Sequence, residues 1–374
     1  MLKIHLFQAI RTVLLSLTFL CLLLTTAQAQ SGVKRYLYVA EPGIRNYLEY
    51  GGHGILVYDI DDNYKLVKRI PTGSLDATGH PSNVKGVCVS LATQCIYVST
   101  VKSLMCISLQ SEKLLWEKIY EAGCDRMAIS PDGLTIFQPS FEKDQWYVLD
   151  AKTGEVKEQI VLKSKAHNTI FAPNGKAVYM EGLASPYVTV VNPKNTSKQR
   201  QIGPFSASVR PFTIDGKQSL LYGNVNELLG FEIADLKTGK MIHRVEVPGF
   251  EKGFIKRHGC PSHGIGLTPN EKELWVADGA NQRMHIFDNQ QMPPRYLSSV
   301  ALRDQPGWIT FSMDGRHAWP STGEIIDIAS KEIIQRLADE KGEIVQSEKV
   351  VEIHFQGGKA VKKGDQFGLG RVVK

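Results

Sequence analysis

Ile129–Gly133 reads ISPDG, and related stretches follow at Phe171–Gly175 (FAPNG), Thr213–Gly216 (TIDG), Leu267–Glu271 (LTPNE) and Phe311–Gly315 (FSMDG). Each is an apolar run that ends in a turn, because Asp, Asn and Gly tolerate the backbone angles of a tight hairpin. The Asp or Asn positions are 132, 174, 215, 270 and 314, so the spacings are 42, 41, 55 and 44 residues. A period of this length indicates a repeat architecture.

One repeat can be followed through Asp125–Leu162. The pattern predicts short strands at Met127–Ser130 and Thr135–Gln138, then at Trp146–Asp150 and, more exposed, at Glu155–Leu162. Four antiparallel strands joined by short turns make one blade of a β-propeller. The chain is therefore expected to be all-β.

The ends of the chain predict how the ring closes. The N-terminus supplies strands at Arg35–Ala40, Ile55–Ile60 and Lys65–Ile70 but no first strand, and Val350–Phe355 (VVEIHF) is unused at the other end. We expect Val350–Phe355 to be the innermost strand of the N-terminal blade, because this pairing removes an open sheet edge. The result is a seven-bladed propeller of four-stranded blades. The alternative is an open array, or six blades with a separate tail.

Residues 1–29 resemble a secretory signal peptide. Lys3 and Arg11 precede a short apolar run at Val13–Leu24, and Ala27–Ala29 (AQA) fits a cleavage site. We therefore expect a periplasmic or extracellular protein, with residues 30–374 forming one propeller domain. A retained membrane anchor is the alternative, although the run is short for a bilayer span.

Composition adds limits on partners. Removal of Lys3 and Arg11 lowers the formal charge from +6 to +4, a mild excess that does not indicate a nucleic-acid partner. We expect a monomer without stable membrane insertion. The remaining cysteines are too few, and odd in number, for a disulfide framework, and they are expected to be buried apolar residues: Cys88, Cys95, Cys106, Cys124 and Cys260.

The turns, strands such as LWVAD and IYVST, and the D-x-x-TGK pattern at Asp150–Glu155 and Asp235–Lys240 resemble the YVTN-type, YncE-like β-propeller repeat proteins of bacteria and archaea. The repeats are WD40-like in length. The second unit departs from the pattern, since Leu91–Gln94 (LATQ) replaces PDGK. The resemblance covers nearly the whole mature chain and implies an exported seven-bladed propeller, while it says little about activity.

Aligning the repeats on their turns predicts a binding site at one mouth of the central channel. The residues that enter the first strand of each blade form a chemically mixed ring, which suits a polar small ligand or a peptide. An anionic ligand would pair with Arg126 and Arg210, while Trp308 would offer an apolar face. The alternative is a solvated mouth whose charges pair with one another. The predicted ligand-binding residues are Lys85, Asp125, Arg126, His167, Asn168, Arg210, His263 and Trp308.

Two long loops, Glu41–Gly54 and Pro248–Ser262, are expected on the same face. The second is basic and aromatic, so it could either hold an anionic ligand or partner or cover apolar surface.

No GxSxG, HExxH, P-loop or GxGxxG motif is present, so the sequence favours a binding protein without cofactor over an enzyme. The alternative is a metal-assisted lactonase or related hydrolase, in which a divalent cation such as calcium is held by oxygen-bearing side chains on this face. The candidates for it are Glu41, Glu181, Asn224, Asn226, Glu227, Asp278 and Asn281.

Overall fold

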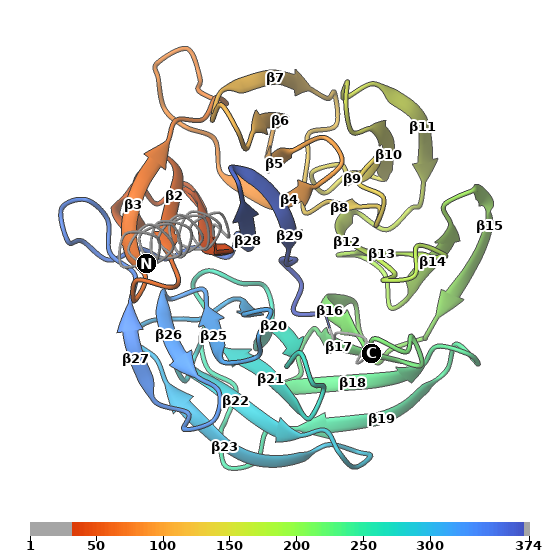
Figure 1. Cartoon of the computed structure of the whole chain (residues 1–374). Helices are drawn as coiled ribbons and strands as arrows, with labels where there is room; N and C mark the ends of the chain where they lie inside the picture. The colour runs from red at the N-terminus through yellow and green to blue at the C-terminus, as the bar shows by residue number, and fades with distance from the viewer. Residues whose placement is uncertain (1–31, 370–374) are drawn as a thin grey trace, which may run out of the picture.

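The computed structural model describes residues 32–369. Seven antiparallel sheets stand around a central channel as the blades of a propeller (Figure 1). Within the described chain the helical element is one 3-10 turn, η1 (Leu48–Tyr50), and no helix there is long and apolar enough to cross a membrane. The expected seven-bladed all-β fold is confirmed. The predicted signal peptide, residues 1–29, lies outside the described residues.

The second to fourth blades follow the predicted four-strand plan. The second blade comprises β4 (Val84–Ser90), β5 (Cys95–Thr100), β6 (Ser103–Ser108) and β7 (Leu114–Ile119). The third comprises β8 (Ala128–Ile129), β9 (Thr135–Pro139), β10 (Gln145–Asp150) and β11 (Val156–Val161). The fourth comprises β12 (Ala166–Phe171), β13 (Val178–Gly182), β14 (Val188–Asn192) and β15 (Asn195–Ile202).

The fifth to seventh blades repeat this plan. The fifth comprises β16 (Val209–Ile214), β17 (Leu220–Val225), β18 (Gly230–Asp235) and β19 (Met241–Glu246). The sixth comprises β20 (Ser262–Leu267), β21 (Glu273–Asp278), β22 (Arg283–Asp288) and β23 (Arg295–Ala301). The seventh comprises β24 (Ile309–Phe311), β25 (His317–Pro320), β26 (Glu324–Asp327) and β27 (Ile333–Arg336).

The first blade joins the two ends of the chain. β1 (Lys34–Glu41) pairs with β28 (Val350–Gln356) as well as with β2 (Gly54–Asp59), and β3 (Lys65–Ile70) is outermost. The predicted closure is therefore confirmed. One expectation is wrong: β28 is not innermost, because β29 (Lys359–Lys363) pairs with its other edge and gives this blade five strands. Figure 1 shows β29 nearer the centre of the ring than β28.

The core lies between adjacent blades, where the apolar faces of their sheets meet. Trp275 of the sixth blade, for example, packs with Ile309 and Phe311 of the seventh, and all three are buried. The outermost strands alternate between exposed and half-buried residues, as β7 and β19 show. Burial between neighbours explains why each repeat needs the next one for stability.

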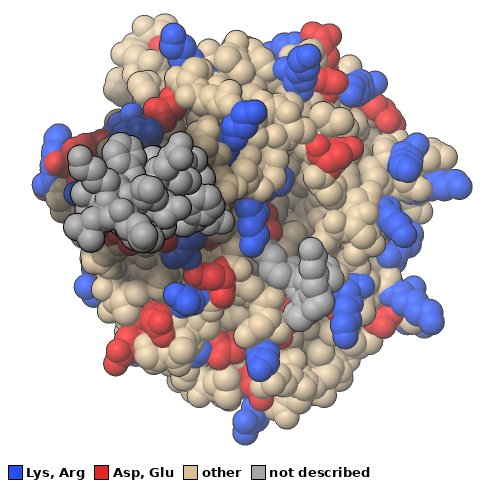
Figure 2. All heavy atoms as spheres, viewed as in Figure 1, with Lys and Arg blue, Asp and Glu red and all other residues tan. Residues whose placement is uncertain are grey.

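All five cysteines of the described chain are buried and free of disulfides. Cys88 and Cys106 each lie opposite Tyr97 in the register, so they are two strands apart. On the face shown in Figure 2, Lys and Arg side chains gather along the right-hand rim, whereas acidic and basic side chains are mixed around the rest of it.

Candidate functional site

A pocket of about 130 Å³ lies at the channel mouth where the first strands of the blades begin. It brings together every predicted ligand-binding residue except Asn168. The lining residues are Ile44, Arg45, Asn83, Lys85, Asp125, Arg126, Phe141, Glu142, His167, Leu183, Arg210, Arg257, His258, Gly259, His263, Trp308, Glu348 and Lys349.

Asp125 organises one side of the pocket. Its buried carboxylate contacts the Lys85 Nζ at 3.4 Å and the His167 Nδ1 at 2.8 Å, through different oxygens. Burial would raise the pKa of Asp125, but the charges of Lys85 and His167 outweigh it, so the pKa lies below its usual value. Asp125 is thus ionised at neutral pH and holds two donors at the mouth.

Arg126 is not free to bind a ligand in the way the sequence predicts. Its side chain is 4% exposed, and it pairs with Glu348 at 3.2 Å. Its guanidinium also covers the ring of Trp308, with Cζ 3.3 Å from the ring centroid. Burial lowers the pKa of Arg126 to about 10, which leaves it charged at neutral pH. The expectation that Trp308 offers an open apolar face is therefore wrong: it is 4% exposed and covered by a cation.

Asn168 lies behind the pocket rather than in its wall. Its side chain donates to Glu181, at 2.8 Å, and both residues are buried. Burial raises the pKa of Glu181 to about 7, although His167, Asn168 and Arg210 each favour its charged form. The polar layer below the mouth therefore contains a carboxyl group that titrates near neutral pH.

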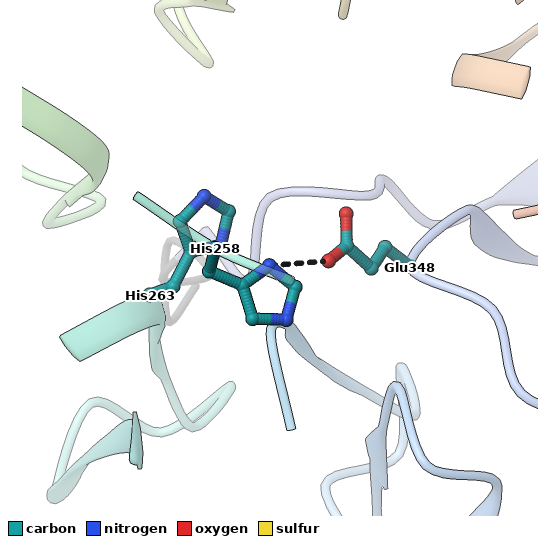
Figure 3. A group of neighbouring side chains, drawn as sticks. All are labelled: His258, His263 and Glu348. Carbon is teal, nitrogen blue, oxygen red and sulfur yellow. Dashed lines mark ion pairs between the residues drawn. The ribbon is translucent and has the colours of Figure 1, made fainter. Parts of the chain in front are cut away.

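Glu348 is a buried lining residue of the pocket, and Figure 3 shows its carboxyl group facing His258. Its Oε2 accepts from Lys349 at 2.7 Å and from Arg126 at 3.2 Å, while its Oε1 lies 3.4 Å from the Nδ1 of His258. Burial alone would raise the pKa of Glu348, but Lys349 and the other neighbouring basic groups hold it well below its usual value. The Glu348 carboxylate thus forms ion pairs with two buried cations, Arg126 and Lys349.

His258 and His263 stand beside Glu348 as neutral imidazoles. Burial lowers the pKa of His258 to about 4 and that of His263 well below its usual value. The ring centroids are 4.6 Å apart, and the Nδ1 of His263 lies 2.8 Å from the Gly307 carbonyl oxygen. Within residues 32–369, these three residues form the only group of three His, Cys, Asp or Glu side chains whose ligand atoms lie within 4.8 Å of one another. The oxygen-bearing residues considered for calcium are not among them.

Two cations of the pocket have no carboxylate partner in the part of the chain that the structure describes. Arg210 donates from Nε to the Asn226 side chain at 2.7 Å, and its Nη2 lies 3.4 Å from the Gly259 carbonyl oxygen. Arg45 donates to the Arg257 carbonyl oxygen at 2.9 Å. The hydrogen-bond partners of both guanidinium groups are amide and carbonyl oxygens, so both groups remain available to an anion.

The two long loops meet over this pocket. Arg257 of the second loop donates to the hydroxyl of Tyr50 in the first, and to Asp304 at 2.8 Å. Phe250 packs inward on His285 with ring centroids 4.7 Å apart, whereas Phe254 is 81% exposed. One part of the second loop therefore covers apolar surface, while Arg257, His258 and Gly259 line the pocket.

Sequence reasoning missed Arg45, Glu348 and Lys349. Glu348 and Lys349 directly precede β28, the strand that supplies the missing first strand of the N-terminal blade. They therefore occupy the same place in their blade as the predicted residues do in theirs. Extending the alignment to Val350 would have found them, whereas Arg45 lies in a loop that has no equivalent in the other blades.

Comparison with known proteins supports the fold and leaves the family open. No family model matches the chain, and no curated protein matches it. Among solved structures, it is similar to the dihydro-heme d1 dehydrogenase NirN in complex with DHE, with a TM-score of 0.61 and 14% sequence identity over 88% of this chain and 72% of that chain. The fold therefore places the chain in the structural class of seven-bladed β-propellers. A YVTN-type membership is supported by the sequence resemblance alone.

Proposed function

We propose that this protein is an exported propeller that binds a small anionic ligand at its channel mouth and has no catalytic role of its own. The charge of the pocket carries the proposal: its lining holds six Lys or Arg residues against three Asp or Glu residues. Asp125 and Glu348 are each shared by several donors, and Glu142 is the third acid. A surplus of fixed donors in a concave site favours an anion.

The anion would be held on the open side of the pocket. Lys85 and His167 are fixed by Asp125, and Arg210 has no carboxylate partner among the described residues. A carboxylate or phosphate bridging these groups would form charge-assisted hydrogen bonds without displacing the buried Arg126–Glu348 pair. The apolar part of the ligand would contact Phe141, which also lines the pocket.

The pocket volume limits the ligand. About 130 Å³ is below the roughly 300–1,000 Å³ of pockets that bury drug-sized ligands. The similar NirN structure is a complex with DHE. A large ligand would require the Pro248–Ser262 loop to move, whereas a phosphate or a small carboxylate fits the closed arrangement.

Titration calorimetry of the mature protein with inorganic phosphate and with citrate tests the proposal. We expect one site per chain whose affinity falls as salt is added. Arg210→Ala should weaken binding about tenfold or more, since hydrogen bonds to charged groups contribute roughly 1.5–3 kcal/mol. Arg200→Ala, on the exposed outer strand β15, is the matched control and should bind as the parent does. Equal binding by both variants, or no binding to the parent, would count against the proposal.

The cluster of His258, His263 and Glu348 supports a second candidate, a metal-assisted hydrolase. Two imidazoles and a carboxylate are a ligand set of catalytic zinc sites. Arg126 and Lys349 already neutralise Glu348, however, and a divalent cation would add charge beside them. Anion binding is therefore the function that this geometry favours. Lactone hydrolysis that requires added zinc or calcium, stops with chelator and is lost in His263→Ala would establish the alternative.

A further inference from the structure

The C-terminal segment Gly364–Leu369 lies inside the channel, beyond the floor of the pocket. After β29 the chain runs across the centre of the ring (Figure 1). The segment contacts the second, third, fifth, sixth and seventh blades, so it is held by the ring as a whole rather than by one sheet.

Gln366 is recognised through both ends of its side-chain amide. Its Oε1 accepts from the backbone N–H of Val87 at 3.0 Å, and its Nε2 donates to the backbone carbonyl of Met127 at 3.1 Å. Its own carbonyl accepts from the indole Nε1 of Trp308. Gln366 is 1% exposed, so a side chain that could not make both bonds would leave a buried donor or acceptor unpaired.

Phe367 and Leu369 are recognised by apolar burial. Phe367 is 5% exposed, and its ring meets Trp308 edge-on at a centroid distance of 6.3 Å. Both residues belong to the apolar cluster that includes Phe171 and Phe212 of neighbouring blades. The segment thus inserts two hydrophobic side chains between the blades.

Gly368 occupies a position that disfavours other residues. Its φ is +55°, and an added Cβ would lie 3.0 Å from the Cα of Gly266. Its carbonyl accepts from the Leu267 N–H and from the Thr213 hydroxyl, each at 3.0 Å. A larger residue would have to move backbone, so this position selects glycine on steric grounds.

We propose that the channel below the pocket is a sequence-selective peptide-binding site that the chain's own residues 364–369 occupy. Its ligand is a bent segment in which glutamine, an aromatic residue, glycine and an aliphatic residue follow one another. Hydrogen bonds to main-chain groups contribute affinity, and the fit of the Gln366, Phe367 and Leu369 side chains contributes selectivity, as in other modes of peptide recognition. Trp308 lies between this site and the proposed anion pocket, because it lines the pocket and also contacts Gln366 and Phe367.

A chain that ends at Lys363, mixed with a fluorescent amidated peptide of residues 364–369, tests this proposal by fluorescence polarisation. We expect one peptide to bind per chain. Peptides carrying Gln366→Ala or Phe367→Ala should bind at least tenfold more weakly, because each removes one recognition element. A folded truncated chain that ignores the peptide, or binds all three equally, would overturn the proposal.

A second variant covers the case in which the shortened chain does not fold. A protease site inserted between Lys363 and Gly364 lets the full chain fold before the segment is cut. Native mass spectrometry should then show the segment retained after cleavage and exchanged for labelled peptide added in excess. Immediate loss of the segment without exchange would contradict the proposal.

Discussion

At the scale of single residues, the sequence predicts where Arg126 lies but not what its side chain binds. The repeat register places it at the channel mouth, and the structure finds it there. Its role depends on Glu348, which is 222 residues away in sequence and approaches from the first blade. The repeat register predicts where the backbone of a residue lies, but tertiary contacts determine the partner of its charged group. Arg126, which was predicted to contact a ligand, therefore forms a buried ion pair with Glu348.

Glu181 gives a prediction about pH at the same scale. Because burial raises its folded-state pKa to about 7 from a reference of 4.5, the unfolded chain loses this proton first as the pH rises. Its contribution to stability is present below pH 4.5, is lost as the pH rises towards 7, and stays absent above. Glu181→Gln should therefore match the parent at pH 4.5 and be more stable at pH 8 by up to ~3 kcal/mol, at about 1.4 kcal/mol per pKa unit.

Urea denaturation of both proteins across this pH range measures the difference. Glu121→Gln, an exposed glutamate on a turn, is the matched control and should follow the parent at every pH. Parallel stability curves for Glu181→Gln and the parent would show that the carboxyl is ionised without penalty in the folded state.

At the scale of elements, the strands were predictable and the additions to them were not. The alternation of apolar residues and the PDG-type turns identified the blades, and Val350–Phe355 was correctly paired with β1. The strand at Lys359–Lys363 was not predicted, because a short, mostly polar segment after a Gly-Gly turn has the pattern of an unstructured tail. It forms a strand because it pairs with the open edge of β28. The recognition of Gln366 and Gly368 rests on five blades at once, which no local pattern reveals.

Truncation before Val350 tests the closure of the ring. It removes β28, β29 and the channel segment, so β1 loses one of its two partner strands, and the buried side chains of Val351 and Ile353 are lost. At roughly 1.5–3 kcal/mol for each buried apolar side chain, the free energy of unfolding should fall by several kcal/mol. Thermal and urea unfolding measure this, with a chain ending at Leu369 as the control. An unchanged melting temperature would contradict closure by β28.

At the scale of the whole molecule, the propeller is a closed ring whose two long loops meet over one mouth of the channel. The scaffold alone does not define a function, since propellers host many unrelated activities. What distinguishes this chain is the charge gathered at the mouth, which comes from residues spread from Arg45 to Lys349. The ring explains how residues so distant in sequence form one site.

Export is a prediction about the whole chain that rests on its first 29 residues. The charged start, the short apolar run and Ala27–Ala29 predict cleavage after Ala29. Mass spectrometry of the protein recovered from outside the cytoplasm should find an N-terminus at Gln30. An intact Met1 on a membrane-associated species would show that the segment is a retained anchor.

The most direct test of the central claim, anion binding at the mouth, is a crystal structure of the mature protein grown with selenate. The account predicts an anomalous peak inside the pocket, within hydrogen-bonding distance of Arg210 and of Lys85 or His167. The Arg126–Glu348 pair should remain intact below it. Peaks confined to lysines and arginines of the outer rim, with none in the pocket, would contradict the claim.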